Sequence, residues 1–177
     1  MLTSLRIVVG AMMAFLLLIA LSLSFVLAPS GSSPPDQGLL DAPAPWVPAA
    51  LLAGGVALHL VITAVGYRTP AIVPGTPPEV AGRAAAGALT SGTFLRAALA
   101  ESLALLALAL AFVLIEGGFV TYLCGAAVSL ALSALHAFPR EATIRRTEES
   151  LERQGGTSYL RQQLSLPAPR SGAVQEL

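Results

Sequence analysis

Residues 93–115 read TFLRAALAESLALLALALAFVLI, an apolar run with one carboxylate, Glu101, near its middle. As a helix, this run extends about 35 Å, which is enough to span a hydrocarbon core of about 30 Å. A charged side chain at that depth costs on the order of 3 kcal/mol on insertion. Residues kept at such a cost usually have a partner or a task, so Glu101 is the first candidate for function.

Three further apolar runs cover residues 6–28, 47–67 and 118–138. The chain is 55% hydrophobic and only 11% charged, which is far more apolar than a soluble domain. A bilayer admits only helices or closed barrels, and the strict alternation of a barrel strand is absent. We therefore predict an all-α polytopic membrane protein, with four transmembrane helices at about 6–28, 47–67, 93–115 and 118–138 in a domain of residues 1–138.

The first run differs from a secretory signal peptide. Its apolar stretch, residues 7–28, exceeds the roughly 7–15 residues of a signal core. In addition, Pro29 directly follows Ala28, where a peptidase would cleave. The sequence predicts an uncleaved first helix.

The arginines predict the orientation, since the chain has no lysine. Nine of its ten arginines follow residue 67, whereas the loop at 29–46 holds Asp36 and Asp41 and no basic residue. Basic residues favour the cytoplasmic side, so we expect both termini in the cytoplasm and the turn at residues 116–118 outside. Arginine in place of lysine and abundant Ala, Gly and Pro are typical of a high-GC bacterial genome, which indicates a bacterial inner (plasma) membrane.

Residues 139–177 are expected to form a cytoplasmic tail. Residues 140–153, REATIRRTEESLER, offer Glu–Arg pairs four residues apart and predict a helix, followed by a mostly disordered stretch. This charged helix is either a solvated helix or a docking surface for a cytoplasmic partner. Before the third span, the Ala-rich residues 79–89 predict a short helix lying at the inner surface.

Charge excludes some partners. The net charge is zero, so there is no electrostatic case for nucleic acid. The tail's six arginines are accompanied by five glutamates, which argues against a strong lipid-binding basic patch. The expected partners are the lipid bilayer and another membrane protein or a second copy of the chain.

Two residues and one stripe are the candidate sites. Counted along their helices, Glu101 and His59 lie at nearly equal depth, which makes them a candidate pair for binding a proton or cation. The structural interpretation is that a protonated Glu101 only hydrogen-bonds a serine or His59 and fixes the packing. On the fourth helix, small and polar residues recur every four positions and allow close approach of another helix: Thr121, Gly125, Ser129 and Ser133.

The remaining titratable residues have simpler interpretations. His136 is expected at the membrane interface, Glu116 is close enough to water to reach it, and Cys124 is a small apolar residue within its helix. One cysteine and two histidines on separate helices do not provide the ligands of a zinc site. The sequence also contains no phosphate-binding loop and no hydrolase motif. We therefore expect no metal, no cofactor and no enzymatic activity. The predicted role is an accessory or structural subunit, with a small proton- or cation-coupled carrier using Glu101 as the alternative.

Residues 78–114 resemble the second helix of the proteolipid ring subunit (subunit c) of rotary ATP synthases. The resemblance rests on a Pro-Glu polar loop, the context AALAESLAL around Glu101 and the ending Ala-Phe-Val at 111–113. It implies that Glu101 is a proton-binding carboxylate. The chain departs from that family in its longer polar loop, its first helix and its charged tail. As a whole it is similar to small four-helix membrane proteins of actinobacteria.

Overall fold

The computed structural model describes residues 1–28, 38–114 and 116–167, and within these ranges it contains helices and no strand. Four helices are long and apolar enough to cross a membrane, which confirms the predicted all-α fold class. The elements are α1 (Leu2–Val26), α2 (Trp46–Val65), α3 (Pro78–Val113), α4 (Gly118–Leu132), the π-helical turn η1 (Ser133–Ala137) that continues α4, α5 (Glu141–Glu152) and α6 (Leu160–Gln163).

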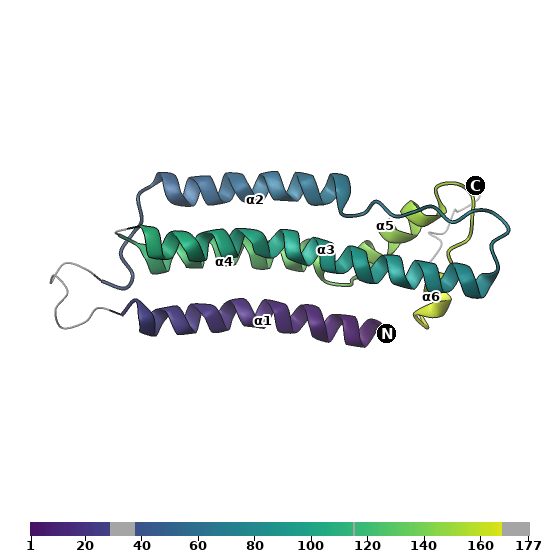
Figure 1. Ribbon diagram of the computed structural model, residues 1–177, viewed down its shortest axis with the longest axis horizontal. Helices are drawn as coiled ribbons and strands as arrows, with labels where there is room; N and C mark the ends of the chain where they lie inside the picture. Colours follow the sequence, from purple (N-terminus) through teal and green to yellow (C-terminus); the bar gives the residue numbers. More distant parts are fainter. Residues whose placement is uncertain (29–37, 115, 168–177) are drawn as a thin grey trace, which may run out of the picture.

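The helix α3 is one continuous element of 36 residues, about 54 Å long. The sequence predicted two elements here, a short surface helix at 79–89 and a span at 93–115, and the structure corrects this division. Pro77 and Pro78 start the helix, and no proline interrupts it afterwards. Glycine within a helix costs only about 1 kcal/mol, so the intervening glycines do not break it. In Figure 1, α3 extends well past the ends of α1 and α2.

The four long helices run side by side, with α3 and α4 between α1 and α2 (Figure 1). The helix α4 contacts each of the other three. One of these contacts is a hydrogen bond in which the fully buried Tyr122 hydroxyl donates to the Leu16 carbonyl of α1, at 2.8 Å. The N-terminus, α5 and α6 all lie at the same end of the bundle, which we call the tail end.

At the tail end, a second apolar core forms around the extension of α3. Its members come from α1, from the loop between α2 and α3, and from α3, α5, α6 and the residue after α6: Leu5, Ile72, Ala81, Ala85, Leu89, Ile144, Leu151, Leu160 and Leu164. The tail therefore packs against the helical domain, and the chain folds further than the predicted helix at 140–153. Of the stretch predicted to be mostly disordered after residue 153, residues 154–167 are described and include α6, and residues 168–177 lie outside the described residues.

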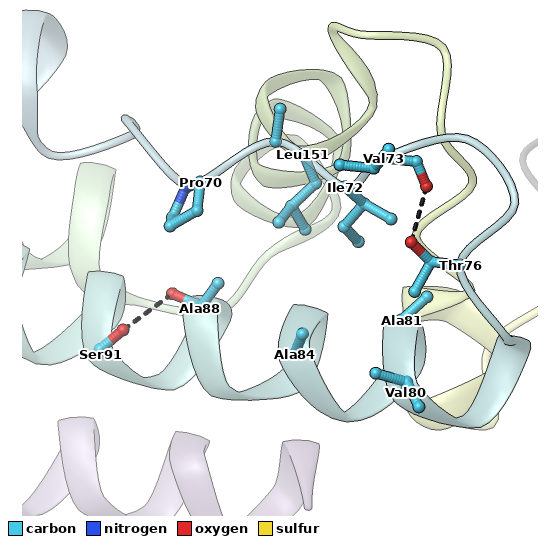
Figure 2. A pocket seen from close by; sticks show the side chains of 11 residues that line it. Pro70, Ile72, Val73, Thr76, Val80, Ala81, Ala84, Ala88, Ser91 and Leu151 are labelled. Carbon is cyan, nitrogen blue, oxygen red and sulfur yellow. Dashed lines mark hydrogen bonds between the residues drawn. The ribbon is translucent and has the colours of Figure 1, made fainter.

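The loop at 68–77 covers α3 only partly. The Ile72 amide donates to the Leu151 carbonyl at 2.8 Å, which ties this loop to α5. A pocket of about 450 Å³ lies between the loop and α3. Its lining residues are mostly apolar and include Val73, Val80 and Leu151 (Figure 2). No charged side chain is among the described residues that line this pocket.

Candidate functional site

Glu101 lies on the outward side of α3 and is partly exposed. It shares one helix stripe with Phe94, Leu105 and Phe112, all of which are exposed. Among the described residues, no side chain or backbone group forms a hydrogen bond or ion pair with the Glu101 carboxylate. The carboxylate inside the third span is thus left without a partner from the described part of its own chain.

His59 hydrogen-bonds a different residue from the one that the sequence indicated. Its Nδ1 lies 2.9 Å from Nε2 of His136, at the end of α4, and no bond or ion pair joins it to Glu101. Equal depth places two residues at the same level of a bundle but leaves their directions around the helix axes open. His136, expected at the interface, is 3% exposed and lies inside the protein.

Tyr67 extends the histidine pair into a chain of three rings. Its hydroxyl lies 3.1 Å from Nδ1 of His136. Both contacts are satisfied with neutral imidazoles if Tyr67 donates to Nδ1 of His136 and the Nε2–H of His136 donates to Nδ1 of His59. His136 reaches both partners from η1, where the Phe138 amide bonds the Ser133 carbonyl five residues back. Such π-helical turns are frequent at functional sites.

Arg96 lies next to Tyr67 and is the largest fully buried side chain described, at 1% exposure. Its Nη1 donates to the Gly66 carbonyl at 2.9 Å and its Nη2 to the Thr93 hydroxyl at 3.1 Å. Gly66 is the C-cap residue of α2, so the guanidinium satisfies a carbonyl at the negative end of that helix. The guanidinium carbon also lies 4.5 Å from the centroid of the Tyr67 ring, within cation–π range.

A glycine makes room for this arginine. A Cβ at Gly92, one turn before Arg96 on α3, would lie 3.2 Å from Nη1. The Arg96 Nε has no hydrogen-bond partner among the described residues. The guanidinium is therefore held through its two terminal nitrogens and the Tyr67 ring.

The small-residue stripe of α4 lies in the interface with α3. All four residues are buried. A Cβ at Gly125 would come within 2.2 Å of the Ala107 Cβ on α3, so the two backbones approach closely at this position. The Oγ atoms of Ser129 and Ser133 are buried without a hydrogen-bond partner among the described residues.

Sequence reasoning missed the role of Arg96 and the link from Tyr67 to His136. The signal for Arg96 was present, because this arginine sits in the same apolar run as Glu101 and a buried charge there needs partners. No comparable signal marked Tyr67, because its position next to a helix end is ordinary for an interfacial aromatic residue.

The described geometry therefore offers two separate features, an outward carboxylate on α3 and a buried Arg–Tyr–His–His chain between α2, α3 and η1. No family model, curated protein or solved structure matches this chain, so its function is argued from these two features alone.

Proposed function

We propose that this protein is an accessory or structural subunit of a bacterial inner-membrane assembly, without enzymatic activity. It acts through helix–helix contacts and its cytoplasmic tail. The observation that carries the proposal is the unpartnered Glu101 carboxylate on the outward stripe of α3. A carboxylate facing hydrocarbon is costly, and a donor from a neighbouring helix removes much of that cost.

The proposed occupant of this stripe is a transmembrane helix of another protein that places a hydrogen-bond donor opposite Glu101. The exposed Phe94, Leu105 and Phe112 give that helix apolar surface on both sides of the carboxylate. In this arrangement Glu101 fixes register and partner choice, as buried polar groups do in other helix interfaces.

A photo-crosslinking amino acid at Leu105 tests this assignment in membranes of cells that make the full chain. Leu105 is 57% exposed and shares the Glu101 stripe, whereas its neighbour Leu106 is 53% exposed and points about 100° away around the helix. We expect a discrete protein adduct from position 105 and much less from position 106, which is the matched control.

Variants of Glu101 complete this test. Glu101→Leu removes the acceptor and is expected to abolish the adduct at 105, whereas Glu101→Gln keeps hydrogen bonding and is expected to retain most of it. Equal adducts at 105 and 106, or an adduct indifferent to Glu101→Leu, would contradict the proposed interface. An adduct with the mass of two chains would assign the stripe to a second copy. Proton flux into vesicles holding the purified chain, lost on Glu101→Gln, would instead support the carrier alternative.

The orientation makes a separate prediction. After Cys124 is replaced by alanine, a cysteine at Leu40 and one at Gln154 report opposite ends of the bundle, and both positions are exposed. With both termini cytoplasmic, a membrane-impermeant thiol reagent should label intact spheroplasts at position 40 and not at position 154. The reverse labelling would overturn the orientation.

A further inference from the structure

The described glutamates of the tail all contact other residues of the tail. Glu141 and Glu148 both contact Arg161, with the Glu148 contact at 3.1 Å. Partial burial raises the pKa of the Glu148 carboxyl above its usual range, while Arg161 opposes this rise. Glu152 accepts from the Ser158 amide and hydroxyl at 2.8 and 2.7 Å.

Three described arginines of the same segment form no ion pair with a described residue, and one of them, Arg153, instead donates to the carbonyls of Thr69 and Ser150. Arg145 pairs with Glu149 at 3.5 Å, but Arg140 and Arg146 form no ion pair with any described residue. The tail sequence has nearly equal numbers of arginines and glutamates. In the folded tail, however, the described glutamates contact other residues, so the positive charges of Arg140 and Arg146 are not paired.

Arg140 and Arg146 both line one pocket of about 210 Å³, which the Tyr67, His136 and His59 side chains also line. Among the described residues no carboxylate lines it, and its polar lining consists of His59, Tyr67, His136, Arg140, Thr143 and Arg146. The guanidinium carbon of Arg146 lies 5.3 Å from the centroid of the Tyr67 ring, against which Arg96 also lies. Two guanidinium groups thus line the pocket and a third, that of Arg96, lies against the Tyr67 ring, which gives this region a positive potential.

The position and size of the pocket narrow the class of ligand. It lies where α2 and η1 end, at Val65 and Ala137, which is the level at which the apolar spans give way to polar residues. Its volume is below the roughly 300–1,000 Å³ of sites for drug-sized ligands, so it suits a small charged group. Arginine forks match phosphate oxygens, and basic pockets at this level bind lipid head groups.

We propose that this pocket binds a phosphate group, carried by an anionic phospholipid head group or by a small soluble phosphate ester. Arg140 and Arg146 supply the charged donors, and one Arg140 donor is already used on the Leu135 carbonyl at 3.1 Å. The site is separate from the Glu101 stripe, so the experiment on this pocket does not depend on the proposed subunit role.

Native mass spectrometry of the detergent-solubilised full chain tests the lipid arm, with phosphatidylglycerol and phosphatidylcholine of matched acyl chains as probes. Calorimetric titration with glycerol 3-phosphate tests the soluble arm. The variant is Arg146→Gln, and the matched control is Arg145→Gln, which removes the same charge from the adjacent exposed position. We expect Arg146→Gln to weaken binding by on the order of tenfold, the effect of losing one charged hydrogen bond, and Arg145→Gln to leave binding nearly unchanged.

The two arms identify the source of the phosphate. Preference for phosphatidylglycerol that Arg146→Gln removes assigns a lipid, and binding of glycerol 3-phosphate with the same sensitivity assigns a soluble ester. The proposal is overturned if phosphatidylglycerol binds no better than phosphatidylcholine and glycerol 3-phosphate gives no binding signal. It is also overturned if Arg145→Gln and Arg146→Gln weaken binding equally. Circular dichroism and the unliganded melting temperature of each variant establish that it is folded.

Discussion

Gly125→Leu is expected to destabilise the bundle by about 3 kcal/mol, because the added side chain has no space. A Cβ at this position already lies 2.2 Å from the Ala107 Cβ and 3.3 Å from the Leu103 carbonyl oxygen. The helices α3 and α4 would have to separate along their whole contact, which removes the close packing that holds membrane helices together. Unfolding of the purified protein in mixed micelles measures the loss.

The control for this prediction is Leu130→Ile, a change of shape without change of volume at a partly exposed position of α4. It should cost less than about 1.5 kcal/mol. If Gly125→Leu and Leu130→Ile unfold at the same denaturant concentration, the stripe at 121–133 does not carry the α3–α4 contact.

Arg96→Leu is expected to cost about 2–4 kcal/mol, the combined effect of a buried carbonyl left without its donor and a lost cation–π contact. The affected groups are the Gly66 carbonyl, which is the C-terminal cap of α2, and the Tyr67 ring. Since Tyr67 also bonds His136, the variant should loosen the His59–His136 contact as well. Thermal unfolding in detergent measures the first effect, and imidazole NMR signals report the second.

Two further variants separate this role from a general loss of charge. Arg96→Lys keeps one charged donor and is expected to retain part of the stability, although a lysine does not reproduce the fork of two donors. Arg83→Leu makes the same substitution as Arg96→Leu at an exposed position of α3 and should change stability little. Equal losses for Arg83→Leu and Arg96→Leu would contradict the capping role of Arg96.

The number of spans and the all-α class followed from the sequence because they depend on one-dimensional quantities. A run of about 20 apolar residues is long enough to cross a bilayer whatever it packs against. The stripe from Thr121 to Ser133 was equally readable, since a repeat of four residues places small side chains on one face of any helix. Its burial against α3 follows directly from that face.

The predicted division of α3 into two helices was wrong because it also rested on a one-dimensional quantity, the apolar content. Apolar content drops before residue 93, which marks where a membrane span starts, but a helix does not end where its surroundings change from lipid to protein. Only the packed core around Leu89 and Ile144 shows what continues to support it.

Which polar groups meet was beyond the reach of the sequence, because it depends on how each helix is turned about its axis and on which side chains fold back together. His59 and Glu101 share a depth but not a contact, while His59, His136 and Tyr67 meet from two helix ends that are distant in the chain. The charges behave likewise, since the tail is nearly neutral by composition, yet Glu141 and Glu148 contact Arg161 while Arg140 and Arg146 line a common pocket. Length and periodicity are local properties of a helix, whereas the direction of a side chain and its partner are fixed only when all the helices pack against one another.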